Sequence, residues 1–388
     1  MRKPYVVIII VLLVITLAWA YWQHSFQRPF LEVGKIRTLS LFPDGKIVVV
    51  SNIPDTNIGS LAVYSPNGTL LWNLTFGENG AYWDSVLYAK VSPDGKHIGV
   101  MTRNKFMLYE EKGTLLWERK NPLSGRLWSE GPQWASVQFT DDSRYVAFGA
   151  TASKSIFWVF SINGSPLLNG TAEGITGMKV STEGVYLMEN HLFSTSGVRG
   201  SKILHYSFNK SNWSLEFPSG SPRAIDVLKT ANGTYVAYAD CALGVTLIKN
   251  GTVLWNRDKG TCYWDVAFWY GKIYAATTTG LVNVYSLDGR LLSRILTPES
   301  GIPTLLPAPT KILLLQKIVL PPDNKRWVVD VFTMNSTGDA IKVGSLEGFP
   351  AGDFSSHITA DYRKGELVLG VKESGKDEKY GVYVIFVD

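Results

Sequence analysis

The chain alternates short hydrophobic runs with compact polar turns, and this pattern predicts strands. Apolar residues, many of them β-branched or aromatic, fill short runs such as Lys46–Ser51, Tyr145–Gly149 and Lys272–Thr277. Short apolar runs of this kind, bounded by turn residues, are typical of strands. Outside residues 5–22, no stretch longer than ten residues has helical periodicity. We therefore expect an all-β body.

One turn recurs at a regular interval. Residues 42–45 read Phe-Pro-Asp-Gly and residues 92–95 read Ser-Pro-Asp-Gly. Weaker copies stand at 140–143, 181–184, 230–233, 269–271, 309–311 and 362–365. The 320 residues from Gly45 to Gly365 divide into seven steps of about 46, which is close to the ~40 to 50 residues of a propeller blade. The turns therefore indicate eight repeats.

A second turn falls between consecutive copies of the first. It stands at 66–68, 111–113, 162–164, 209–211, 249–251, 287–289 and 335–338, each time between alternating apolar runs. Tight turns of this kind join antiparallel strands. Each repeat is therefore predicted to form four antiparallel strands, A to D.

These repeats predict a single eight-bladed β-propeller over residues 26–388. The eighth repeat ends after three strands, the last being Tyr380–Val387. Residues Phe26–Gly34 can supply its outer strand, which would close the ring by a three-plus-one pairing and leave no unpaired edge. A seven-bladed ring is the alternative, because Pro303–Pro309 makes a poor inner strand.

The amino-terminal segment is predicted to cross a membrane. Residues 5–22 contain Thr16 as their only conventionally polar residue, and this length just spans a hydrocarbon core of ~30 Å. Arg2 and Lys3 would keep residues 1–4 in the cytoplasm and place the propeller outside the cell. The alternative is a signal peptide cleaved near Ala20, which would release a secreted protein.

Nine Asn-x-Ser/Thr sequons agree with export. They begin at Asn67, Asn73, Asn163, Asn169, Asn209, Asn212, Asn232, Asn250 and Asn335. Several also follow from turn chemistry, because Asn-Gly favours tight hairpins. Glycosylation at these positions would indicate an archaeal or eukaryotic cell surface.

Composition narrows the function. Charged residues make up 18% and aromatic residues 12%, which suits an aromatic-packed β-rich body. Without Arg2 and Lys3 the chain has 36 basic and 33 acidic residues, since the whole has 38 and 33. So small a surplus of positive charge does not predict a basic surface patch, and nucleic acid is therefore not an expected partner.

Three of the second turns carry a resemblance to known families. The runs that end at Trp72, Trp117 and Trp255 read Gly-Thr-Leu-Leu-Trp, Gly-Thr-Leu-Leu-Trp and Gly-Thr-Val-Leu-Trp. They resemble the Gly-x-x-x-Trp docking motif of the quinoprotein-like (PQQ-like) propellers, while the Pro-Asp-Gly turns are similar to WD40-like repeats. The resemblance implies that each Trp packs against peptide planes of the next blade.

Quinone chemistry is not expected despite this resemblance. The quinoprotein dehydrogenases hold their cofactor with adjacent cysteines, a calcium ligand set and a catalytic Asp. Here Cys241 and Cys262 are 21 positions apart, so they are not adjacent cysteines. The calcium ligands and the catalytic Asp of those enzymes cannot be matched to particular residues of this chain. The five histidines are scattered without metal-ligand spacing. We therefore expect neither a cofactor nor a metal.

The A–B and C–D turns should share one face of the ring, which we expect to lie toward the membrane. The opposite face collects longer, aromatic connections. Candidate partner-binding residues there are Tyr82, Trp83, Asp84, Trp128, Trp134, Tyr263, Trp264 and Asp265. Aromatic residues are enriched at contacts because they bury much area at low entropic cost. The alternative is that these rings only cap the inner strands.

Cys241 and Cys262 are expected on that same face in adjacent connections. An oxidising compartment would favour a disulfide between them, and two buried free thiols are the alternative. Asp84 and Asp265 both follow Tyr-Trp, and as a pair they would suit Ca²⁺ or acid/base chemistry.

The sequence favours a membrane-tethered extracytoplasmic propeller that binds or scaffolds a protein or glycan of the cell envelope. The alternative is an extracytoplasmic enzyme, either quinoprotein-like or a glycan-active hydrolase or lyase, with acidic residues near the propeller axis. The ligand and the oligomeric state are left open.

Overall fold

The computed structural model describes residues 31–33, 35–52, 58–77, 86–124, 134–193, 198–297, 300–307, 312–320, 326–334, 340–348, 359–363, 366–372 and 380–386. Several predictions fall outside these ranges. They are the membrane span at 5–22, the candidate residues Tyr82, Trp83, Asp84 and Trp128, and the sequon at Asn335.

The elements of the described part are all strands, and they form eight four-stranded antiparallel sheets. Sheets 1 to 4 consist of β2 (Lys35–Leu41), β3 (Ile47–Asn52), β4 (Gly59–Tyr64) and β5 (Leu70–Phe76); β6 (Val86–Val91), β7 (His97–Thr102), β8 (Lys105–Glu110) and β9 (Leu115–Lys120); β10 (Trp134–Phe139), β11 (Tyr145–Thr151), β12 (Ser155–Ser161) and β13 (Pro166–Ala172); and β14 (Ile175–Ser181), β15 (Gly184–Phe193), β16 (Val198–Ser207) and β17 (Trp213–Phe217).

Sheets 5 to 8 follow the same order along the chain. They consist of β18 (Pro222–Thr230), β19 (Gly233–Asp240), β20 (Gly244–Lys249) and β21 (Thr252–Arg257); β22 (Tyr263–Trp269), β23 (Lys272–Thr277), β24 (Leu281–Tyr285) and β25 (Leu291–Leu296); β26 (Ile302–Pro307), β27 (Ile312–Leu320), β28 (Arg326–Met334) and β29 (Ala340–Gly348); and β1 (Leu31–Val33) with β30 (Thr359–Arg363), β31 (Glu366–Lys372) and β32 (Tyr380–Phe386).

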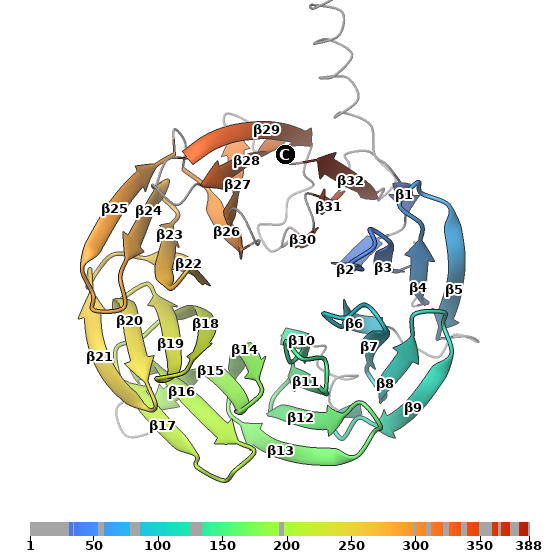
Figure 1. The fold of residues 1–388 in the computed structure, drawn as a ribbon, viewed down its shortest axis with the longest axis horizontal. Coiled ribbons are helices and arrows are strands. Elements are labelled where there is room, and N and C mark those ends of the chain that lie inside the picture. Colours follow the sequence, from blue (N-terminus) through green and yellow to red (C-terminus); the bar gives the residue numbers. More distant parts are fainter. Residues whose placement is uncertain are drawn as a thin grey trace, which may run out of the picture.

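The sheets follow one another around a ring, and the strand nearest the axis is the first strand in sheets 1 to 7 and β30 in sheet 8 (Figure 1). Sheet 8 joins the two ends of the chain, because β1 pairs antiparallel with β32 and Glu32 lies opposite Gly381. This is the N-terminal pairing expected for the last repeat. The all-β prediction is confirmed.

The hydrophobic core lies between neighbouring sheets. One cluster joins Val48 and Leu61 of sheet 1 to Ile98 and Val100 of sheet 2, and each of these side chains is fully buried. Comparable clusters lie between sheets 2 and 3, 3 and 4, 4 and 5, 5 and 6, and 6 and 7. Among the sheets whose burial the structure describes, sheets 2 to 6 therefore bury both of their faces, which fixes their positions in the ring.

Tryptophans dock several of the sheets onto the next one. The indole Nε1 of Trp117 donates a hydrogen bond to the Ile162 carbonyl oxygen at 2.8 Å, and that of Trp255 donates to the Leu287 carbonyl oxygen at 3.0 Å. Both rings press against a turn glycine of the next sheet, where a Cβ at Gly164 would lie 2.9 Å from the Trp117 ring. The packing implied by the resemblance is therefore present.

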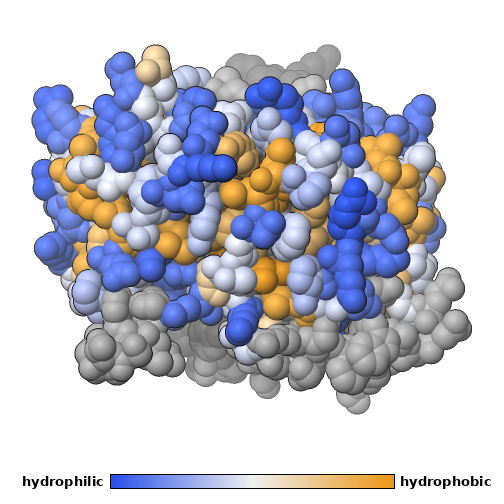
Figure 2. Space-filling view, turned by 90° about the horizontal axis from the view of Figure 1, so that it is seen from below, coloured by the Kyte–Doolittle hydropathy of each residue, from blue (hydrophilic) through white to orange (hydrophobic). Residues whose placement is uncertain are grey.

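A recurrent β-bulge shapes the outer wall. In sheet 1, Val63 pairs with Trp72 but Tyr64 pairs with Leu70, so Leu71 is the extra residue. Sheets 2, 3, 5 and 6 repeat this shift, and two successive outer residues become exposed. The exposed aliphatic residues at these bulges, at 40–48%, are Leu70, Leu71, Leu115, Leu116, Leu167, Val253, Leu254, Leu291 and Leu292. Figure 2 shows such hydrophobic side chains interleaved with hydrophilic ones.

The proline-rich segment does form an inner strand, so the objection behind the seven-bladed alternative does not hold. In β26, Pro303 lies opposite Gln316, and the Leu305 N–H points out of the ladder to donate to Asp265 of sheet 6. Pro303 and Leu305 are two residues apart in the strand, so their backbone nitrogens point the same way, and the nitrogen of Pro303 also faces away from β27. The missing N–H therefore removes no hydrogen bond from the ladder.

Candidate functional site

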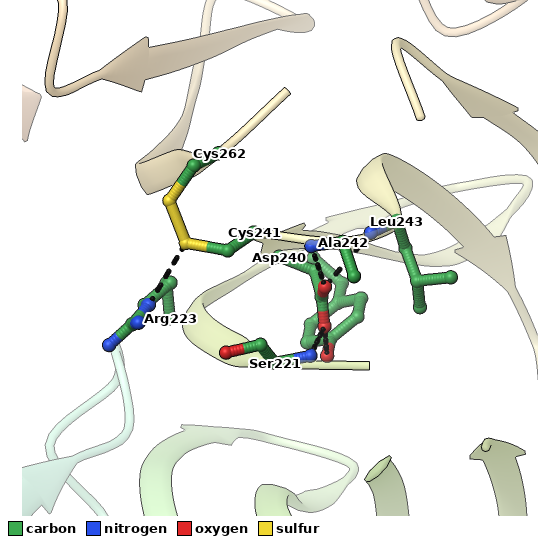
Figure 3. The surroundings of a disulfide bond; sticks show 8 residues. Ser221, Arg223, Asp240, Cys241, Ala242, Leu243 and Cys262 are labelled. Atoms are coloured by element: carbon green, nitrogen blue, oxygen red, sulfur yellow. Dashed lines mark hydrogen bonds between the residues drawn. A yellow bond between two sulfur atoms is a disulfide. The ribbon is translucent and has the colours of Figure 1, made fainter. Parts of the chain in front are cut away.

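The site lies on the face of the ring that we call the connection face, where B strands join C strands and each sheet joins the next. The opposite face, with the tight A–B and C–D turns, is the turn face. At the connection face a disulfide links Cys241, which follows β19, to Cys262, which precedes β22 (Figure 3). The predicted disulfide is therefore confirmed. It ties sheet 5 to sheet 6, and a loop of this length contributes ~3 kcal/mol to stability.

A buried carboxylate fixes the turn beneath the disulfide. One oxygen of Asp240 accepts the N–H groups of Ala242 and Leu243 at 2.7 and 2.9 Å. The other accepts the Ser221 N–H at 2.7 Å and the Tyr238 hydroxyl (Figure 3). Burial and then the Asp240 charge raise the pKa of Tyr238, so that its phenol stays a donor. Cys241 is thus held on a rigid turn.

An exposed arginine lies beside this disulfide. The Arg223 guanidinium stands 4.4 Å from the centre of the Trp264 ring, and its Nε donates to the Cys241 sulfur at 3.2 Å. A cation over an indole face gains roughly 0.5–1 kcal/mol at an exposed site. Arg223 is exposed and Trp264 half-buried, and Lys259 is a second exposed cation in the adjoining connection.

β-Bulges aim both side chains of this pair. Ladder pairing shifts register between Pro222 and Ala224 and again between Tyr263 and Asp265, so Arg223 and Trp264 are the extra residues of their inner strands. Bulges re-aim side chains and are common beside functional sites. Arg223 was not among the residues predicted from the sequence. An alignment of the repeats could have identified it, because Arg223 occupies the position in its inner strand that Trp264 occupies in the next.

Tyr263 is not part of an exposed surface, which corrects its assignment as a contact residue. It is fully buried, and its hydroxyl donates to Asp258 at 2.7 Å. Asn283 donates to the same carboxylate oxygen at 2.9 Å, and the Tyr285 hydroxyl donates to it as well. Burial would raise the pKa of Asp258, but these hydrogen bonds together hold it below its ordinary value. The cluster is structural.

Asp265 lies on the inner strand β22, and it interacts electrostatically with Asp226 and Lys179 of the inner strands β18 and β14. Burial raises the pKa of Asp265 to about 6, although two backbone N–H groups oppose the shift. Its oxygens accept the N–H groups of Val266 and Leu305 at 2.8 and 2.7 Å. Asp265 is thus a half-buried clamp between sheets 6 and 7, and not the surface contact we expected.

Asp226 clamps the neighbouring junction in the same way. One oxygen accepts the Phe268 N–H at 2.7 Å, and the other lies 3.0 Å from the Lys179 amine. Asp226 raises the pKa of Lys179. All four oxygens of the two carboxylates are therefore occupied, and their arrangement fits inter-sheet bridging better than acid/base chemistry. Among the described residues, no group of three or more acidic, His or Cys side chains could hold a metal ion.

The remaining predicted residues are placed as follows. Trp134 begins β10, half-buried, and packs over Gly149 of the next strand, where a Cβ would lie 2.8 Å from the indole. Eight sequon asparagines are described and all are exposed. Those in turns of the turn face are Asn67, Asn163, Asn209, Asn212, Asn232 and Asn250, whereas Asn73 and Asn169 lie on the outer strands β5 and β13. Within the described ranges, no helix has the length and apolar character needed to span a bilayer.

Neither the family models nor the curated proteins contain a match to this sequence. Solved structures do share the fold. The WD40 domain of Sif2 has a TM-score of 0.59 at 12% identity, covering 93% of this chain and 99% of that one. BamB from Moraxella catarrhalis has a TM-score of 0.53 at 12% identity, covering 92% and 99%.

Sqt1 from Chaetomium thermophilum, solved with the N-terminus of ribosomal protein L10 bound, has a TM-score of 0.59 at 13% identity and covers 91% and 97% of the two chains. Identities this low show a shared fold and not a shared activity. The chain therefore has a WD40-like β-propeller fold.

Proposed function

We propose that this propeller is a binding and scaffolding module that holds a protein partner at its connection face, with Arg223 and Trp264 at the centre of the contact. The observation that carries the proposal is a guanidinium stacked 4.4 Å from an indole beside a disulfide-locked turn. Arg and Trp are the residue types most enriched at the energetic centres of interfaces. Similar propellers bind peptides, as Sqt1 does in its complex.

The chemistry of the partner follows from charge. The exposed groups at this corner are the cations Arg223 and Lys259, whereas Asp240 and Asp258 are consumed by internal hydrogen bonds. A partner segment that carries carboxylates would pair with the cations, and its apolar part would cover Trp264. Capture of a glycan in place of a protein is the competing outcome.

The proposal extends to location and to the ring itself. The propeller would be an eight-bladed ring closed three-plus-one, glycosylated and tethered outside an archaeal cell by residues 5–22. The eight four-stranded sheets, the β1–β32 pairing and the exposed sequons support this proposal, as does a disulfide, which persists in oxidising compartments. With the turn face toward the membrane, the connection face would look outward.

Affinity capture from the native cell envelope tests this proposal. The full chain is compared with the Arg223→Ala/Trp264→Ala double variant. The matched control is Arg144→Ala, because Arg144 is an exposed arginine 5.5 Å from the ring of Tyr145 but lies at the turn face. We expect the double variant to lose at least tenfold of a protein partner and the control to lose none. Equal recovery by all three proteins would refute the proposed contact.

A further inference from the structure

A pocket of about 300 Å³ opens at the turn face between sheets 4 and 5. It lies on the opposite face of the ring from Arg223 and Trp264, so a ligand in this pocket would be separate from a partner at the connection face. Sheet 4 contributes most of its lining and sheet 5 the rest. The lining residues are Glu183, Tyr186, His205, Ser207, Asn209, Ser211, Trp213, Thr234 and Asn250.

Short turns in sheet 5 explain the opening. Thr230 pairs with Gly233 and Lys249 with Thr252, so each of these hairpins has only two loop residues. In sheet 1 the corresponding turns occupy residues 42–46 and 65–69. Asn250 and Gly251 have φ of 48° and 81°, as a tight Asn-Gly turn requires. Less backbone therefore covers the junction of sheets 4 and 5.

His205 occupies a position that is aliphatic in other repeats. It lies opposite Trp213, as Val63 lies opposite Trp72, Leu108 opposite Trp117 and Leu247 opposite Trp255. Those three aliphatic residues are fully buried, and His205 is 7% exposed.

Neither ring nitrogen of His205 makes a well-formed hydrogen bond, although the Ser211 backbone lies close enough to act on its pKa. An unsatisfied buried polar group costs about 1–3 kcal/mol, and a leucine here would not incur that cost. His205 thus replaces the aliphatic residue of other repeats although the replacement lowers stability. A destabilising residue of this kind indicates a functional site, and here it points to a ligand.

Aromatic rings enclose this imidazole. The Tyr186 ring stacks on it at 4.3 Å, and the Trp213 ring lies 5.4 Å away. Burial lowers the pKa of His205 to about 4, against the opposing charge of Glu183. The ring is therefore neutral at physiological pH, with one nitrogen to donate a hydrogen bond and one to accept.

The remaining lining excludes anions. Glu183 is the only formally charged residue among those that line the pocket, and it lies 3.2 Å from Lys229 and accepts a hydrogen bond from Thr234. The other polar groups are hydroxyls and amides. At ~30 Å³ per water, the volume equals about ten waters, which leaves room for one six-membered sugar ring.

We propose that this pocket binds one neutral sugar ring, with an apolar C–H face against Trp213 and hydroxyls paired with His205 and Glu183. The sugar could come from two sources. Asn209 and Asn250 both line the pocket and both begin sequons, so a glycan on this chain could fold back into it. A glycan of another molecule is the second source, and the chemistry of recognition is the same for both.

The test measures the His205 imidazole directly by NMR in the full chain produced without glycosylation. Glucose, galactose, mannose and N-acetylglucosamine are titrated separately, with inorganic phosphate as the anionic probe. We expect at least one sugar to shift the His205 resonances saturably and phosphate to leave them unchanged. Glu183→Gln should weaken that binding at least fivefold, while Glu111→Gln, at the junction of sheets 1 and 2, should not. If no sugar shifts His205, or if only phosphate does, the proposal is wrong.

His205→Leu separates binding from folding. This variant restores the residue found at two equivalent positions, so we expect it to raise Tm while it abolishes sugar binding. An unchanged sugar affinity in a folded His205→Leu protein would overturn the role of His205.

The same NMR titration on glycosylated protein distinguishes the two sources of the sugar. If His205 is already shifted there and added sugar no longer binds, the occupant is the chain's own glycan. If added sugar still binds, the occupant comes from another molecule.

Discussion

At the scale of single residues, tryptophan and arginine act as paired fasteners between sheets. Trp117 and Trp255 each donate to a carbonyl of the next sheet, and the arginine two positions later reaches the carbonyl of the turn glycine there. Arg119 donates to Gly164 at 2.9 Å and Arg257 to Gly289 at 3.1 Å. The sequence motif predicts the tryptophan contact but not the arginine, which is visible only once the two turns are placed side by side.

Trp255→Ala should destabilise the protein by about 3–5 kcal/mol, because it empties a buried site and removes an inter-sheet hydrogen bond. Trp255→Phe keeps a ring and should lose only about 1–2 kcal/mol. Urea unfolding measures both. The control is Leu296→Ala, since Leu296 is 76% exposed in the next sheet and should change stability by at most ~0.5 kcal/mol. Equal losses for Trp255→Ala and Leu296→Ala would contradict the docking role.

His205 makes stability depend on pH. Its pKa falls from 6.5 in the unfolded chain to about 4 in the fold, so below pH 6.5 the unfolded chain takes up a proton that the native protein does not. The contribution of His205 to stability should therefore fall by about 3 kcal/mol between pH 6.5 and 4, whereas Asp265, whose pKa is raised to about 6, contributes in the opposite direction.

The charged groups near His205 are Glu183 and its partner Lys229, and neither changes charge over most of this range. Urea midpoints at half-unit pH steps give the profile, and the difference between the unaltered protein and His205→Leu should show the fall that His205 causes. A profile that is the same in both proteins would show that another group titrates.

At the scale of elements, the turns determine how closely the sheets approach. Gly164→Ala should be strongly destabilising, because φ is +83° and the new Cβ would lie 2.9 Å from the Trp117 ring. Gly271→Ala isolates the backbone cost alone, since its φ is +67° and nothing lies within 4 Å. We expect ~1 kcal/mol for Gly271→Ala and at least ~1 kcal/mol more for Gly164→Ala. Thermal unfolding compares them, and similar losses would mean that the indole moves aside freely.

The elements also separate what a sequence can predict from what it cannot. Pro-Asp-Gly and Asn-Gly turns depend on a few adjacent residues, so their positions follow directly from the chain. The bulges at Arg223 and Trp264 arise from register across two strands, and no local pattern marks them. For the same reason Tyr263 was interpreted as a surface aromatic, although its hydroxyl turns inward to Asp258. Local turn chemistry was thus readable and side-chain direction at the strand start was not.

At the scale of the whole molecule, the pairing of β1 with β32 joins the two ends of the chain. A Glu32→Cys/Gly381→Cys double variant should form an intramolecular disulfide, because these residues are partners in the ladder. The bond would close a loop of about 350 residues and should raise Tm. Non-reducing electrophoresis and mass spectrometry detect it. Glu32→Cys with Tyr383→Cys is offset by two residues and should crosslink poorly, and equal yields from both pairs would contradict the register.

The repeat length predicted this architecture because each sheet obeys the same local rules. The sequence could not indicate that His205 and Tyr186 stack beside a pocket, since they come from different strands of sheet 4 and the cover is missing from sheet 5. Aligning repeats after the fold is known shows the anomaly, because Val63, Leu108 and Leu247 stand where His205 does.

The central claim is that the partner contacts the connection face, and photo-crosslinking from the two ends of one strand tests it most directly. A benzophenone amino acid replaces Trp264 at the start of β22, or Tyr270, which follows that strand at the turn face and is 66% exposed. After irradiation in the native envelope, we predict a protein adduct from position 264 and none from position 270. Adducts only from position 270, or equal adducts from both, would contradict the account.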